Sequence, residues 1–314
     1  MGLKAQKEKE IKIDAITKKV LYYLGIDYRT PRNKLAKIIS ISPQRLNHRI
    51  KQLESQLIKP YICLNYPLLN IQAYLLLYES LDEGEVENIS NSEKTYYLLR
   101  LAGKNQYLAI ILADDILEFC STATKNSTPQ IFSLTKFIPD GWNGYGIGAN
   151  SKTKKDKTKK YYLETEDYKI LLFLSKKSTI SKFELSKQLK MSVKTIKKRM
   201  KLMEESDIIQ GYKFSINLPK IGFLTYIIHL TCRPDEVYKN INLIQSDNYA
   251  GFLFQSDNQL FFSYIVPESK YLFNFLERIE KETNSIVDLS QNTGDYLVEP
   301  VPKTVINYLE NKSK

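Results

Sequence analysis

The sequence predicts an α+β protein made of two copies of one unit. Three observations support this prediction. The chain has 314 residues, more than a single hydrophobic core usually holds. The stretch SPQRLNHRIKQLE (42–54) returns in pattern 150 positions later as SVKTIKKRMKLME (192–204). In both halves, apolar residues first recur at helical spacing and then form strand-like runs.

The repeat keeps its order along the chain. VLYYL (20–24) aligns with ILLFL (170–174) at an offset of 150, and KNQYLAIIL (104–112) aligns with DNQLFFSYI (257–265) at an offset of 153. Offsets that grow by single residues indicate a duplication followed by small insertions in loops.

The first part of each unit is helical. Ser42 and Ser192 stand where an N-cap belongs, and Pro43 suits the first helical position. A short strand follows, IKPYICLNY in one unit and IQGYKFSIN in the other. Three helices and a strand predict a winged helix-turn-helix domain. The expected helices are roughly 12–24, 32–39 and 43–56 in the first unit and 166–174, 181–188 and 193–205 in the second.

The second part of each unit is rich in aromatic and aliphatic runs. In the first unit these are AYLLLYESL, KTYYLLRLA, QYLAIILAD and IFSLTKF, separated by helical stretches near 83–91 and 114–124. The second unit repeats this order, with helices at 234–246 and 268–282 and a last strand near 285–291. The order β-α-β-β-α-β predicts a ferredoxin-like domain.

These elements define five segments. A Gly-rich and then Lys-rich stretch with nothing to pack indicates a flexible linker between the units. The expected segments are a first winged helix-turn-helix domain at 10–66, a ferredoxin-like (RAM-like) domain at 67–140, the linker at 141–164, a second winged helix-turn-helix domain at 165–218 and a second ferredoxin-like domain at 219–302.

The third helix of each winged helix-turn-helix domain carries polar and cationic side chains outside its apolar face. Arg and Lys bind guanine or phosphate, while Asn and Gln bind adenine. A helix fits the major groove, and its exposed N-terminal half reaches the bases. Because the whole arrangement occurs twice, DNA binding is favoured over a merely solvated basic face. The candidate DNA-binding residues are Gln44, Arg45, Asn47, His48, Arg49, Lys51, Lys194, Thr195, Lys197, Lys198, Arg199 and Lys201.

Composition agrees with a nucleic-acid partner. The net charge is +11 and the pI is near 9.2, which suits a polyanion. Cys63, Cys120 and Cys232 stand far apart, with only His48 and His229 to join them as ligands. We therefore expect free thiols and no metal site. The N-terminus has no hydrophobic signal segment and no apolar run spans a bilayer, so we expect a cytoplasmic protein without a membrane partner.

One long segment resembles a known family. LAKIISISPQRLNHRIKQLESQLIKPYICLNYPLL (35–69) resembles the DNA-binding half of the Lrp/AsnC (feast/famine) transcription regulators, and DIIQGYKFSINLPKIG (207–222) fits the same pattern. The resemblance covers roughly 12–140 and 165–300. It implies a sequence-specific regulator that binds double-stranded DNA. Ordinary members carry one unit per chain, so two units imply a single-chain pseudo-dimer.

The resemblance also concerns the ferredoxin-like domains. In the family they pair through their sheets, which implies self-association here, either within the chain or in a homodimer. A Gly and an acidic residue near the turn between the second and third strands shape the family's amino-acid site. In this chain only the first unit has the Gly, as Gly103, and Gln106 and Gln259 stand where an Asp is common in the family. A small-molecule effector and a pure assembly role are both open.

Two other functions compete with DNA-binding regulation. Some proteins similar to this family are haem-pathway decarboxylases that use His or Arg near the tetrapyrrole. Here His48 lies in the expected DNA helix and His229 ends a strand, and no Ser/His/Asp or Cys/His set is visible. We therefore expect no enzyme, no catalytic residue and no cofactor.

Replication initiators with two winged-helix domains are the second rival. They need direct repeats, whereas a pseudo-dimer predicts an inverted repeat with half-sites about 34 Å apart. Because the third helices of the two winged helix-turn-helix domains differ in composition, we expect the two DNA half-sites to differ in sequence. The Lys-rich helix of the second unit should supply non-specific affinity, and the first unit should supply base discrimination.

Overall fold

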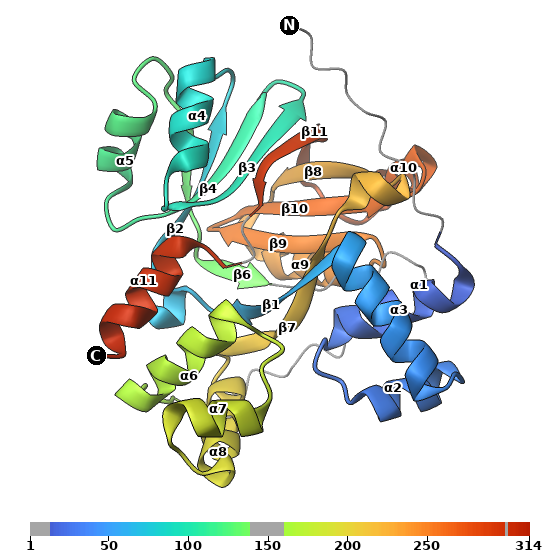
Figure 1. The fold of residues 1–314 in the computed structure, drawn as a ribbon. Helices are drawn as coiled ribbons and strands as arrows, with labels where there is room; N and C mark the ends of the chain where they lie inside the picture. Colours follow the sequence, from blue (N-terminus) through green and yellow to red (C-terminus); the bar gives the residue numbers. More distant parts are fainter. Residues whose placement is uncertain (1–12, 139–159, 299–300) are drawn as a thin grey trace, which may run out of the picture.

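The computed structural model describes residues 13–138, 160–298 and 301–314 (Figure 1). The first unit contains α1 (Ala15–Ile26), α2 (Arg32–Ile39), α3 (Pro43–Gln56), β1 (Ile58–Leu64), β2 (Ala73–Tyr78), α4 (Glu83–Asn91), β3 (Thr95–Ala102), β4 (Tyr107–Leu112), α5 (Ile116–Ala123), β5 (Gln130–Ser133) and β6 (Lys136–Ile138). The second unit contains α6 (Thr165–Lys176), α7 (Lys182–Leu189), α8 (Val193–Glu205), β7 (Ile209–Ile216), β8 (Leu224–Thr231), α9 (Val237–Gln245), β9 (Ala250–Ser256), β10 (Gln259–Val266), α10 (Ser269–Glu282) and β11 (Ile286–Val298). A last helix, α11 (Lys303–Lys312), follows.

The helices and strands therefore follow the predicted order, and α2, α3, α4 and α8 have the predicted bounds. The first helix begins later than expected, at Ala15, because the Asp14 side chain accepts a hydrogen bond from the backbone N–H of Thr17 (2.7 Å) and caps the helix there. Most of the expected linker, 141–159, lies outside the described residues.

The two helix-turn-helix regions are joined by their strands. We call α1 to α3 with β1 the first head, and α6 to α8 with β7 the second head. β1 and β7 form an antiparallel two-stranded sheet that runs from Ile58 opposite Ile216 to Leu64 opposite Ile209. In addition, α1 contacts β7 and α6 contacts β1. Each first helix therefore packs on the strand of the other head.

The remaining strands form one nine-stranded sheet in the order β5-β2-β4-β3-β11-β8-β10-β9-β6. Within each unit the order is fourth, first, third, second, which is that of a ferredoxin-like sheet. β3 pairs with β11, and β6 pairs with β9. Because β5 and β6 follow one another in the chain, residues 130–138 supply both outer strands and link the two ends of the sheet.

The expected single strand near 131–137 is therefore two short strands, each on a different partner. In the second unit, β11 alone fills the matching position. Residues 286–291 of β11 pair with β8, and residues 291–298 pair with β3. The strand expected near 285–291 is longer than predicted because its second half finds a partner in the other unit.

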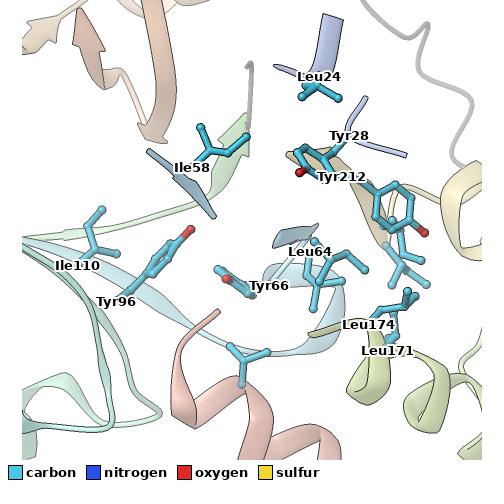
Figure 2. Close-up of a cluster of buried hydrophobic side chains, with 14 of the residues drawn as sticks. Leu24, Tyr28, Ile58, Leu64, Tyr66, Tyr96, Ile110, Leu171, Leu174 and Tyr212 are labelled. Carbon is cyan, nitrogen blue, oxygen red and sulfur yellow. The ribbon is translucent and has the colours of Figure 1, made fainter. Parts of the chain in front are cut away.

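The part of the sheet from the first unit (β5, β2, β4 and β3) packs face to face with the part from the second unit (β11, β8, β10 and β9). The inner faces of these two half-sheets join the cores of the heads. The rings of Phe132 and Phe261 are 4.8 Å apart across the interior. The outer faces pack on the helices of their own units in two separate clusters. The inner cluster is continuous from Val20 in the first head, through the sheets, to Leu309 in α11, and Figure 2 shows part of it around Tyr66 and the strands of the heads. The heads and the sheets thus share one hydrophobic core.

The sequence did not predict α11. Its Val305 and Leu309 are fully buried, and the helix packs on α6 (Figure 1). The hydroxyl of Thr304 donates to the backbone carbonyl of Glu93 (2.7 Å), just before β3. The last helix therefore ties the second head to the sheet of the first unit.

Candidate nucleic-acid interface

α3 and α8, here called the recognition helices, begin at the predicted residues. The Ser42 side chain accepts a hydrogen bond from the backbone N–H of Arg45 (3.2 Å), and the Ser192 side chain accepts one from that of Thr195 (3.0 Å). These bonds satisfy backbone donors that a helix leaves unpaired at its start. The apolar faces that hold the helices are fully or almost fully buried: Leu46, Ile50 and Leu53, and Ile196, Met200 and Met203.

The opposite faces of the recognition helices are open to solvent. Nine of the twelve candidate residues are exposed: Gln44, Arg45, Asn47, His48, Lys51, Lys194, Lys197, Lys198 and Lys201. Thr195 is half-buried, with its hydroxyl 2.8 Å from that of Ser192. The exposed candidates on α3 are two amides, a guanidinium, an imidazole and an ammonium group, while those on α8 are all ammonium groups.

The two matching arginines are turned inward. Arg49 lies 2.8 Å from the Asp14 carboxylate and donates to the Thr17 hydroxyl (2.7 Å). The guanidinium of Arg199 lies 3.1 Å from the Asp167 carboxylate and 2.6 Å from that of Glu164. Both arginines thus fasten a recognition helix to the first helix of its own head. The proposed DNA contact therefore rests on the other candidates.

The two ion pairs differ in how far the acidic side chain is exposed to solvent. The Asp14 side chain is 53% exposed, whereas that of Asp167 is 0% exposed. The backbone N–H of Thr17, and then its hydroxyl and Arg49, hold the pKa of Asp14 at about 2. Sequence reasoning missed both acidic partners, although each first helix has an acidic residue at or near its start.

Charge is segregated along the chain. Residues 10–66 hold 11 Lys and Arg against 4 Asp and Glu, and residues 165–218 hold 12 against 6. The sheet regions have the opposite balance, with 5 basic against 10 acidic residues in 67–140 and 6 against 11 in 219–302. Such a distribution attracts a polyanion to the heads and repels it from the sheets.

Across the parts of the chain that the structure describes, the cysteines and His229 do not form a common site. Cys63 and Cys232 are buried and Cys120 is half-buried, all as free thiols. His229 lies inside the sheet, where its Nε2 is 2.6 Å from Gln259 and its ring stacks on Phe261. Among the described residues, no three His, Cys, Asp or Glu side chains are grouped as ligands for one metal ion.

A cavity of about 10 Å³ lies where the first head meets the sheets, lined by Tyr66, Pro67, Ala73, Tyr96, Ile110, Leu134 and Phe254. Within the ranges that the structure describes, no helix has both the length and the apolar composition to cross a bilayer.

Comparison with solved structures covers nearly the whole chain. The crystal structure of the siroheme decarboxylase NirDL superposes with a TM-score of 0.58 and 13% identity, over 94% of this chain and 97% of that one. At this identity the likeness shows the fold and not the activity.

Comparison of sequences gives the family. Residues 166–210 match a family described as winged helix-turn-helix DNA-binding. An uncharacterized HTH-type transcriptional regulator of Pyrococcus abyssi is 36% identical over 86 residues, 27% of this chain, and the match spans 58% of that relative's length. The HTH-type transcriptional regulator LrpA of Pyrococcus horikoshii is 30% identical over 95 residues, which are 30% of this chain and 67% of LrpA. The chain therefore belongs to the family of Lrp-type helix-turn-helix transcriptional regulators.

Proposed function

We propose that this protein is a transcriptional regulator that binds double-stranded DNA sequence-specifically as a single-chain pseudo-dimer. The observation that carries the proposal is the pairing of β1 with β7, which joins two heads of matching construction on one body. In each head a capped helix is held by a buried apolar face and presents an exposed polar face. Helices of this kind are suited to the major groove.

The segregation of charge supports the same proposal. The basic heads attract the phosphate backbone, and the acidic sheet regions keep the remainder of the protein away from it. Phosphate contacts release counterions, so affinity should fall steeply as salt concentration rises.

The two recognition helices are proposed to contribute unequally. Gln44, Arg45 and Asn47 on α3 can form hydrogen bonds with base edges. Lys197 and Lys198 on α8 are exposed ammonium groups that suit phosphates as point charges. The first head should therefore discriminate between bases, and the second should supply most of the sequence-independent affinity.

The test compares two double variants by selection from random DNA and by titration. Replacing Arg45 and Asn47 by Ala should blur the selected motif in one half-site. Replacing Lys197 and Lys198 by Ala should weaken binding to all sequences and reduce the slope of log affinity against log salt by nearly 2.

The control for this test removes two lysines that are not part of the heads, Lys270 and Lys281 on α10, which are exposed and lie near Glu268 and Glu277. It should leave both the motif and the salt slope unchanged. If neither head variant changes affinity or motif relative to this control, the two-headed reading is wrong.

Assembly is the proposed main role of the ferredoxin-like regions, because their inner faces pack on one another within one chain. An effector, such as an amino acid, is tested by adding amino acids to the same titration. The antiparallel pairing of β1 with β7 also favours an inverted repeat as the target, whereas a replication initiator would select direct repeats.

A second candidate function, tetrapyrrole decarboxylation, has one specific observation in its favour. The fold likeness to the siroheme decarboxylase NirDL covers 94% of this chain. Against it, the likeness is at 13% identity, at which a shared fold does not carry an activity. Titration with an iron-uroporphyrin, followed by its absorbance, separates the two functions, because saturable binding would favour the enzyme.

A further inference from the structure

The two heads touch each other outside the paired strands. Arg29, in the turn between α1 and α2, crosses to the turn between α6 and α7. Its two terminal nitrogens donate to the backbone carbonyls of Ile180 (2.9 Å) and Ser178 (3.3 Å). Its guanidinium also lies over the ring of Tyr212 in β7, 4.8 Å from the ring centroid. One side chain of the first head therefore holds both a turn and a strand of the second.

Tyrosines extend this contact to both recognition helices. The Tyr28 hydroxyl donates to the Glu54 carboxylate in α3, and the Tyr212 hydroxyl donates to Glu204 in α8 (3.2 Å). The two tyrosines meet, because the backbone N–H of Tyr28 donates to the carbonyl of Tyr212 (2.8 Å). Both are almost fully buried, and Figure 2 shows them close together between the heads. Hydrogen bonds thus run from one recognition helix to the other.

The two glutamates are the shared last letters of the repeated stretches, SPQRLNHRIKQLE and SVKTIKKRMKLME. Their side chains have no place in the DNA contact proposed above, and their bonds to the tyrosines give them one here. The bonds reach the C-terminal part of each recognition helix, the end opposite to the one that would read bases. We call this contact of Arg29, Tyr28 and Tyr212 between the heads the junction. A shift at the junction would therefore change the direction in which the N-terminal end of each recognition helix points.

The junction is one-sided. The position 150 residues after Arg29 is Thr179, which is exposed, so the second head has no matching arginine to return the contact. Lys213 adds to the same side, donating to the backbone carbonyl of Gly25 (2.8 Å) in the first head. A symmetric homodimer would make each contact twice, whereas this chain makes it once.

We infer that Arg29 is a positioning residue that sets the relative orientation of α3 and α8, and with it the spacing of the two DNA half-sites. The inference rests on the proposed DNA-binding function and deepens it. One base pair of extra spacing moves a half-site by about 3.4 Å and turns it by roughly 35°. A junction that holds the heads in one orientation would reject that change, and heads that rock about the β1–β7 sheet would tolerate it.

A measurement without DNA tests the junction itself. Spin labels are attached at Gln44→Cys and Lys194→Cys at the starts of the two recognition helices, with Cys120 replaced by Ser, and their distance distribution is recorded. Arg29→Ala should widen this distribution at least twofold. The control, Arg233→Ala, removes an exposed arginine of the sheet region and should leave it unchanged. Superimposable distributions for the two variants would overturn the inference.

Arg29→Lys serves as a second variant in case Arg29→Ala folds poorly. It keeps the charge and loses the paired geometry with which one guanidinium reaches two carbonyls. It should also widen the distribution, which a purely electrostatic role of Arg29 would not produce.

The DNA test uses the selected site with its spacer shortened or lengthened by one or two base pairs. In the unmodified protein the best spacing should be preferred at least tenfold over its neighbours. Arg29→Ala should reduce this preference at least threefold and leave the salt slope unchanged.

A residue that merely touched phosphate would instead weaken every spacing equally and lower the salt slope by about 1. An unchanged spacing profile in Arg29→Ala would overturn the inference. If the unmodified protein selects no DNA, the proposed function fails, and the label distances still decide whether Arg29 orients the heads.

Discussion

Arg199→Ala is the most informative single substitution, because the same position in the first head, Arg49, provides a built-in control. Arg199 lies 3.1 Å from Asp167, whose side chain is 0% exposed. Without the guanidinium, the buried carboxylate keeps only the hydroxyl of Tyr161 (2.9 Å) and the backbone N–H of Glu164 (2.9 Å) as donors. A buried charge would remain without its counter-charge.

The expected cost follows from that geometry. Removing one partner of a buried ion pair costs about 3–5 kcal/mol. The lower end applies here, because two donors remain and the Arg199 side chain is itself 19% exposed, so we expect about 3 kcal/mol. In Arg49→Ala the acid left behind, Asp14, is 53% exposed, and pairs of this kind contribute roughly 0–1 kcal/mol. The two variants should therefore differ by about 2 kcal/mol.

The assay is thermal unfolding of both variants beside the unmodified protein, with hydrogen exchange in α3 and α8. At roughly 2 °C per kcal/mol for a chain of this size, Arg199→Ala should lower Tm by about 6 °C and Arg49→Ala by about 2 °C or less. Exchange should quicken mainly in α8 for the first variant. Equal shifts in Tm would show that burial of the acid does not decide the strength of these pairs, and would refute the reasoning.

Three further substitutions give clear expectations. Glu85→Ala should lower the free energy of unfolding, measured in urea, by about 2–4 kcal/mol. The buried Glu85 carboxylate accepts hydrogen bonds from the backbone N–H groups of Asn126 (2.8 Å) and Ser127 (3.0 Å), and both groups would lose their partner. Burial lowers the pKa of His229 below its ordinary 6.5. The unfolded chain therefore binds this proton at a higher pH than the folded protein does, so the unmodified protein should lose stability as pH falls through about 6.5. His229→Leu should remove this loss when the free energy of unfolding is compared at about pH 7.5 and 5.5. Leu309→Ala should cost about 2–5 kcal/mol and speed hydrogen exchange in α6, because Leu309 is fully buried; unchanged exchange in α6 would contradict the role given to α11.

Local signals predicted the elements of both units. Ser42 and Ser192 both accept a hydrogen bond from the third residue that follows them, and each recognition helix starts directly after its serine. The apolar spacing placed the buried faces of α3 and α8 correctly, since residues such as Leu46 and Ile196 are fully buried. Capping and periodicity act within one turn of the chain, so they are visible in a sequence.

Features that depend on distant partners were not predictable in the same way. The pairing of β3 with β11 and the division of residues 130–138 between two partners depend on where the other unit lies. The helix at 303–312 has two fully buried residues, Val305 and Leu309, one turn apart. That pattern is too short to separate a docked helix from a polar tail. The inward turn of Arg49 likewise required knowledge of the residue at the start of α1.

Carrying both heads on one chain makes unequal heads feasible. In a homodimer every substitution appears in both copies, so a contact such as that of Arg29 with the second head would have to fit twice around a symmetry axis. Here the matching position is Thr179, and the contact is made once. Covalent linkage also removes the dependence of pairing on protein concentration, because the second head is always close to the first. On the proposed function, this allows a Lys-rich α8 to hold DNA and α3 to test its sequence, with the junction fixing the distance between them.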